Sequence, residues 1–270
     1  MVSEKVTLLG KDLYKDIPGE ITLNALPTVS ELEYVGAEDF EQTMLDVIFP
    51  QVISEDFDYR KLLEIDFQWI CRCLRFINYG PYFTTNVILC DNCGPVRGEF
   101  QVDLRSVEIK PLPENVKESL VLKKGELIDY NEDIKLHMLT IKEALDFRKD
   151  KLFVRPNGES NTEYARVCYS ISAMGKELDI NPLTAKLEIE KSMSPADYKV
   201  LKTRVFELLD YGLRGGGHCA CPQCKSPNAG FLALADDRFF RPTVGDLRAG
   251  RNDRNLGGVK NATRSETKAV

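Results

Sequence analysis

The sequence predicts an α+β fold with a mainly helical part at residues 1–80 and a β module built from two distant pairs of cysteines. Three observations lead to this prediction. Apolar residues repeat at helical spacing through residues 67–77, a β-prone run at residues 84–89 leads into one Cys-x-x-Cys pair, and a second pair lies far downstream. With 270 residues, of which 43% are hydrophobic and 29% charged, the chain can bury a substantial core. We expect a single α+β domain at residues 1–242.

Helix-start signals place the helices of the N-terminal part. Thr28 and Glu31 have the spacing of a capping box, in which each residue binds the other's backbone N–H, so a helix is expected to begin there. A second helix is expected at residues 37–45. In residues 67–77 the apolar side chains can share one face while the arginines point outward, which predicts a third helix.

The middle of the chain shows one strand and two further helix starts. Residues 133–139 alternate between polar and apolar and predict a strand, and His137 on it is interpreted as a structural residue rather than a base. Thr140 and Glu143 again have capping-box spacing. Ser194 has the features of a helix cap, because proline follows it and an acidic residue lies in the first turn.

The two cysteine pairs carry the predicted site. Cys90 and Cys93 form a knuckle, a tight turn in which a two-residue spacer lets both thiolates face one ion, and Gly94 supplies backbone freedom after it. Cys221 and Cys224 form a second knuckle, with 127 residues between Cys93 and Cys221. Such a separation means that the tertiary fold must assemble a shared site. We predict one structural Zn²⁺ bound by all four cysteines, since four thiolates leave no position open for water or substrate.

The residues around each knuckle resemble half of a zinc ribbon. The first half is expected at residues 84–110, with strands before and after the knuckle. The second half is expected at residues 215–242, where the apolar run at residues 229–235 is a convincing exit strand. The alternating residues that leave the first knuckle are Phe100, Val102 and Leu104.

The other cysteines have different expected roles. Cys219 and His218 lie beside the second knuckle, and either could replace a cysteine ligand or donate a hydrogen bond to a thiolate; alternatively, Cys219 is a spare thiol in a glycine-rich loop. Cys71, Cys73 and Cys168 lie in apolar surroundings and are interpreted as small core residues. We therefore expect metal ligands and core cysteines rather than a disulfide framework, which agrees with a reducing compartment.

Charge is distributed unevenly along the chain. The formal net charge is −6 and the isoelectric point is about 5.2, which argues against a nucleic-acid footprint over the whole chain. Residues 243–270 carry six cations and three anions, a net charge of +3, so the rest carries −9. This basic tail is rich in Gly and Asn and poor in core-forming residues, so we expect it to dock as an extended segment on a neighbouring chain. No apolar run approaches the roughly 18 residues of a membrane span, so no membrane partner is expected.

Several segments follow one another in a particular order along the chain: residues 26–31, residues 74–80, the knuckle of Cys90 and Cys93, residues 136–143, and the Cys-x-Cys-x-x-Cys run before Phe239 to Pro242. This order resembles the baseplate hub and tail-assembly proteins of contractile-tailed, T-even-like bacteriophages. The resemblance covers most of residues 5–242, and the four knuckle cysteines match it while His218 and Cys219 do not clearly do so. It implies a non-enzymatic protein of the virion tail baseplate, made in the host cytoplasm, that contacts other tail or baseplate proteins and has no small-molecule substrate.

Two other functions compete with this interpretation. A zinc module that binds nucleic acid would need basic and aromatic residues near the knuckles, yet Asp91, Glu99 and Asp103 surround the first one. A thiol redox protein could use a Cys-x-x-Cys pair directly. Other enzymes have little support, because the chain contains two histidines and no phosphate loop, Gly-x-Ser-x-Gly or His-Glu-x-x-His motif.

Overall fold

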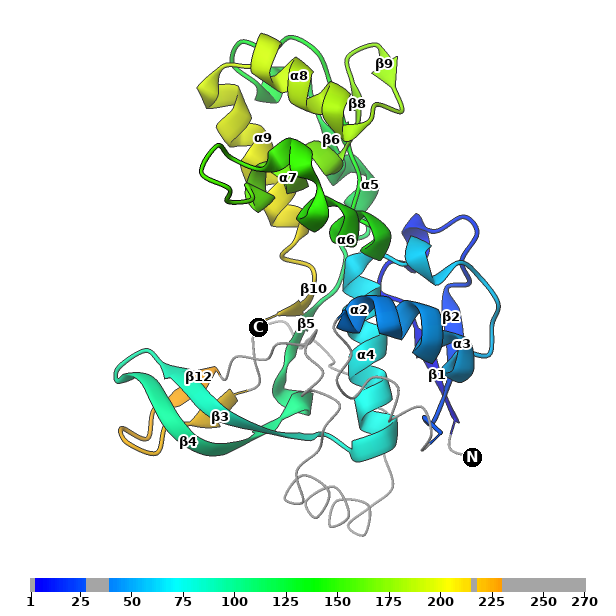
Figure 1. Ribbon diagram of the computed structural model, residues 1–270, viewed down its shortest axis with the longest axis vertical. Helices are drawn as coiled ribbons and strands as arrows, with labels where there is room; N and C mark the ends of the chain where they lie inside the picture. The colour runs from blue at the N-terminus through cyan, green and yellow to red at the C-terminus, as the bar shows by residue number, and fades with distance from the viewer. Residues whose placement is uncertain (1–2, 28–38, 215–217, 230–270) are drawn as a thin grey trace, which may run out of the picture.

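The computed structural model describes residues 3–27, 39–214 and 218–229, and it is a mixture of helices and mostly antiparallel strands (Figure 1). The predicted α+β class is therefore correct. The helix start at Thr28, most of the exit strand predicted at residues 229–235, and the tail at residues 243–270 lie outside the described residues. No helix in the described ranges has the length and apolar character needed to cross a membrane.

The N-terminal part begins with a β-hairpin, so the prediction of a mainly helical start was wrong there. Strand β1 (Ser3–Thr7) pairs antiparallel with β2 (Glu20–Asn24), and a short 3₁₀ turn, η1 (Lys11–Leu13), lies between them. Val6, Ile21 and Leu23 point into the core while their neighbours face outward. This period-two alternation of buried and outward-facing residues is the sequence signal typical of strands.

The helix expected at residues 37–45 starts later and continues further. It begins after Asp39, whose carboxylate accepts a hydrogen bond from the Gln42 N–H, and runs without interruption to Val52. Its middle widens into a π-helical turn because Pro50 has no N–H to donate and its ring crowds the preceding turn. The consecutive elements are α2 (Phe40–Thr43), η2 (Met44–Ile48) and α3 (Phe49–Val52).

The long central helix confirms the predicted helical repeat, but the expectation that its arginines point outward was wrong. Arg72 and Arg75 are only 5% and 0% exposed, because their guanidinium groups donate hydrogen bonds to the backbone carbonyls of Leu104 and Tyr82. Helix α4 (Glu64–Tyr79) follows a 3₁₀ turn, η3 (Tyr59–Lys61), and ends at Gly80, whose φ of 81° favours glycine. Both Cys71 and Cys73 are buried on this helix, and Cys168 is buried on a later one. All three are core residues, as predicted.

The remaining helices pack around a four-stranded antiparallel sheet in the order β6-β7-β8-β9. The predicted strand at residues 133–139 is shorter, and His137 lies just after it. The capping box at Thr140 and the cap at Ser194 are confirmed, because each side chain accepts a hydrogen bond from a first-turn N–H. The strands are β6 (Val121–Leu122), β7 (Ile134–Leu136), β8 (Ile171–Met174) and β9 (Glu177–Leu178). The helices are α5 (Val116–Ser119), α6 (Ile141–Lys149), α7 (Thr162–Tyr169), α8 (Pro182–Ser192) and α9 (Pro195–Leu208), with 3₁₀ turns η4 (Leu104–Ser106), η5 (Lys124–Glu126) and η6 (Lys151–Phe153).

Two of the hydrophobic clusters among the described residues show how the cysteine-containing hairpins relate to the rest of the fold. One large cluster contains buried residues from the N-terminal hairpin through α9. A separate small cluster consists of Ile88, Cys90, Val96 and Cys221, with Phe100 packed against it. The short pair formed by β5 (Glu108–Lys110) and β10 (Gly212–Arg214) lies where the chain passes between these two regions (Figure 1).

Candidate metal centre

Each cysteine knuckle forms the turn of an antiparallel hairpin. The first joins β3 (Tyr82–Cys90) to β4 (Gly94–Asp103), and the second joins β11 (His218–Ala220) to β12 (Pro227–Ala229). Strand β11 contacts β4, and β12 contacts β3, so the two hairpins lie against each other at one end of the molecule (Figure 1). The fold therefore brings together two knuckles that are distant in the sequence.

The two knuckles share a backbone feature after the second cysteine. Gly94 has a φ of 72° and Lys225 a φ of 62°, both in the left-handed region. In the first knuckle the Cys93 N–H donates to Cys90 Sγ at 3.3 Å. In the second, the Lys225 N–H donates to the Cys221 carbonyl at 2.8 Å and closes the turn. The predicted need for backbone freedom at Gly94 is confirmed, and Lys225 adopts the same unfavourable conformation without being glycine.

The four predicted ligands converge. The sulfur atoms of Cys90, Cys93, Cys221 and Cys224 all lie within 4.8 Å of one another, and those of Cys90 and Cys224 are 3.5 Å apart. In a tetrahedral site with zinc–sulfur bonds of about 2.3 Å, neighbouring sulfurs would be about 3.8 Å apart. The four side chains are therefore close enough to hold one metal ion.

Half of the site is buried and half faces solvent. Cys90 and Cys221 are 3% and 0% exposed within the small cluster, whereas Cys93 and Cys224 are exposed. Hydrogen bonds from the Ser226 hydroxyl and backbone lower the pKa of Cys224 to about 6, while hydrogen bonding to Cys224 and burial raise the pKa of Cys93 to about 12. Adjacent thiols oppose each other's ionisation in this way when no cation offsets their charge, and a bound metal ion would favour all four thiolates.

The alternative ligands lie on the strand that enters the second knuckle. His218 and Cys219 belong to β11, where the backbone of Cys219 is opposite Asn228. Their side chains lie outside the described part of the structure. Their participation in the site therefore stays a prediction.

Two polar residues beside the site were missed by the sequence analysis. The hydroxyl oxygen of Ser226 is 2.9 Å from Cys224 Sγ and 3.8 Å from Cys90 Sγ, and Asn92 Nδ2 is 4.0 Å from Cys224 Sγ. Ser226 follows the second knuckle by two residues and Asn92 lies within the first. Their polar side chains next to the ligands were the available signal.

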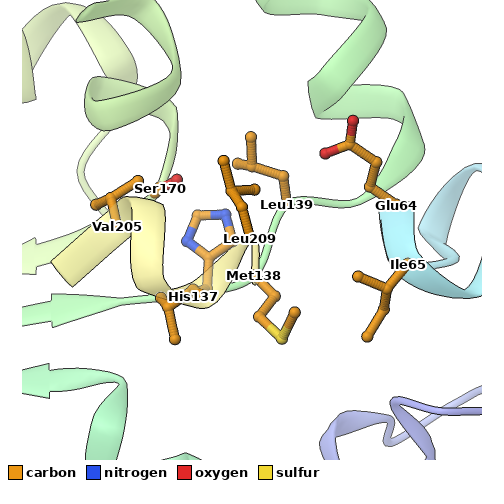
Figure 2. Close-up of a pocket in the computed structure, with 9 residues that line it drawn as sticks. Glu64, Ile65, His137, Met138, Leu139, Ser170, Val205 and Leu209 are labelled. Carbon is orange, nitrogen blue, oxygen red and sulfur yellow. The ribbon is translucent and has the colours of Figure 1, made fainter. Parts of the chain in front are cut away.

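His137 was the other candidate for chemistry, and its surroundings fit the structural role expected for it. Its Nε2 is 3.0 Å from Glu143 Oε1, while Glu143 Oε2 accepts hydrogen bonds of 2.8 Å from both the N–H and the hydroxyl of Thr140. Figure 2 shows the imidazole beside Ser170 and Leu209 in a pocket. The cavity there has a volume of about 20 Å³, which is room for about one water molecule.

Comparison with known proteins adds no relative: the chain matches no family model, no curated protein and no solved structure. Its function must therefore be inferred from its own residues. The convergence of four cysteines is the feature with the clearest chemical meaning.

Proposed function

We propose that this chain is a structural or assembly protein of a contractile phage tail baseplate, and that it acts through protein contacts with support from one structural Zn²⁺. The observation that carries the metal part is the meeting of four cysteine sulfurs from two hairpins. We further propose that the two hairpins form a split zinc ribbon. Zinc is the natural occupant, because tetrahedral sites of four thiolates select zinc or iron–sulfur chemistry, and knuckles on hairpins are typical of zinc.

The closed ligand set supports a structural rather than a catalytic ion. Four thiolates complete a tetrahedral coordination shell, so no position is left where the metal could activate water or polarise a substrate. The ion would instead join the turn at Cys90 to the turn at Cys224. It would thereby link the hairpin of β11 and β12 to the hairpin of β3 and β4, which follows α4 in the chain.

Two cavities in the described part of the structure, one beside His137 and one along α9, offer little support for an enzyme. The cavity beside His137 holds about one water. An open groove of about 460 Å³ follows the outer face of α9, and its lining side chains come from that helix and the residues just after it. Substrate sites normally combine a volume of roughly 300–1,000 Å³ with polar groups that converge from several elements. The first cavity brings Glu64, His137 and Ser170 together but is too small for a substrate, and the groove is lined by α9 and the residue Asp210 after it.

The baseplate assignment rests on the resemblance in the order of sequence elements. The described residues include helix α4, both cysteine knuckles and the capping box of Thr140 as parts of that order. The basic tail adds a surface suited to an acidic neighbour. Together they favour a protein that works by docking.

Four measurements test this proposal. Metal analysis of the purified chain should give about one zinc per chain with thiolate coordination by X-ray absorption, whereas a metal-free dithiol would favour the redox alternative. In infected cells, the chain should be found with baseplates or their assembly intermediates. Deleting residues 243–270 should leave the isolated fold intact but weaken that incorporation, and unimpaired incorporation would contradict the role of the tail. Salt-sensitive binding of DNA or RNA would instead favour the nucleic-acid alternative.

A further inference from the structure

We propose that Ser226 is a positioning residue of the metal centre, whose hydroxyl donates a hydrogen bond to the Cys224 thiolate and holds it in place for the metal. This inference rests on the proposed metal site. It deepens that site by assigning a role to a residue that does not bind the metal itself.

The backbone brings Ser226 back to the knuckle that it follows. Lys225, with its φ of 62°, reverses the chain after Cys224. The Ser226 carbonyl then accepts a hydrogen bond of 2.9 Å from the Cys221 N–H, while its hydroxyl lies 2.9 Å from Cys224 Sγ. Ser226 thus contacts both cysteines of its own knuckle, one through the backbone and one through the side chain.

The same hydroxyl also reaches the other hairpin. Its oxygen lies 3.8 Å from Cys90 Sγ, and Cys90 Sγ is itself 3.5 Å from Cys224 Sγ. Ser226 therefore lies where the two knuckles meet. Its position is suited to setting the orientation of one ligand from each.

The hydrogen bond between Ser226 and Cys224 matters because the proposed metal centre would carry a net negative charge. Four thiolates around a divalent ion leave a net charge of −2, and nearby hydrogen-bond donors stabilise that charge. The described donors to these sulfurs include the Cys93 N–H for Cys90, the Ser226 hydroxyl for Cys224, and the more distant Asn92 amide. Because Cys224 is an exposed ligand, the short bond from Ser226 also restricts a side chain that little else surrounds.

The test compares Ser226→Ala with Ser226→Thr in the full chain. Removal of a hydrogen-bond donor to a metal ligand typically weakens metal binding by about 10–100-fold. We expect Ser226→Ala to lower zinc affinity by that factor in competition with a chelator and to release zinc faster. Threonine keeps the hydroxyl, so Ser226→Thr should restore most of the affinity. Ser192→Ala is the matched control and should leave the affinity unchanged, since Ser192 is an exposed residue at the end of α8, outside both hairpins.

Cobalt substitution provides a readout that a loss of general stability would not change. When Co²⁺ replaces zinc, the thiolate-to-cobalt charge-transfer band should move to lower energy in Ser226→Ala, because a thiolate without its donor gives up electrons more easily. The inference is overturned if Ser226→Ala keeps both the wild-type affinity and the wild-type band, or if Ser226→Thr is as weak as alanine. If the wild-type chain binds no metal, the proposed metal centre itself fails, and this inference fails with it.

Discussion

Replacing Cys221, a buried cysteine of the proposed zinc site, with serine should unfold the proposed metal module, defined here as residues 87–97 and 218–229, while the main core stays folded. Cys221 is fully buried in the small cluster, where its apolar neighbours are Ile88 and Val96. A serine hydroxyl is a poor zinc ligand in place of a thiolate, and it would introduce a polar group into this cluster. The loss of metal should therefore be local in its effect.

The magnitude follows from how little apolar surface holds this module. Burial of Ile88 and Val96 contributes roughly 1.5–3 kcal/mol each. Ordering the twelve residues 218–229 costs on the order of 12 kcal/mol, at about 1 kcal/mol for each backbone. A bound structural zinc contributes on the order of 10 kcal/mol. Without it, apolar burial cannot offset the cost of holding the second hairpin against the first.

Hydrogen exchange measured by mass spectrometry, together with metal analysis, would check this prediction. Zinc content should fall from about one per chain to near zero, and amides in β11, β12 and the knuckle ends of β3 and β4 should lose protection. Amides in α4, α6 and α9 should keep theirs, because these helices belong to the large cluster. Cys73→Ala is the control, since Cys73 is a core cysteine away from the site and its loss should leave zinc content unchanged.

Two outcomes would refute this reasoning. One is a Cys221→Ser chain that loses its zinc but keeps full protection of the metal module, which would show that packing alone holds the hairpins. The other is loss of protection throughout the chain, which would show that the two clusters unfold as one unit.

Two further predictions concern the main core. Burial would raise the pKa of Glu143, but hydrogen bonds from His137 and Thr140 outweigh it and hold that pKa below its ordinary value of 4.5. The contribution of ionised Glu143 to the free energy of unfolding should therefore be complete above pH 4.5 and be lost as the pH falls through the lowered pKa. Melting temperatures of wild type and Glu143→Gln should accordingly differ near neutral pH and converge in acid, and a constant difference would contradict the assigned contacts. Gly10→Ala should destabilise the fold by about 1–3 kcal/mol in urea unfolding, because its Cβ would lie 2.7 Å from the Asp66 carboxylate and closer still to Leu63. Gly125→Ala is the matched control, since a Cβ there meets no atom within 4 Å, and equal effects of the two substitutions would sink the steric explanation.

Local sequence patterns predicted the structure correctly where the interacting residues are close to one another in the sequence. The capping box of Thr140 and Glu143 joins residues three positions apart, so the spacing alone predicts the hydrogen bonds that form. The helical repeat of α4 likewise placed Cys71 and Cys73 in the core. The β1–β2 hairpin was missed because twelve residues separate its short strands from one another, and no tight turn signal marks their pairing.

For the candidate metal centre, too, the sequence predicted some features and only the tertiary structure decided others. The sequence alone indicated that the site could bind a metal, because a two-residue spacer already places two thiolates on one side of a turn. Only the tertiary structure decided that Cys90 and Cys93 meet Cys221 and Cys224, since 127 intervening residues leave their distance undefined until the chain folds. It also decided the position of Ser226, whose approach to Cys224 and Cys90 depends on a chain reversal at Lys225 and on the packing of one hairpin against the other.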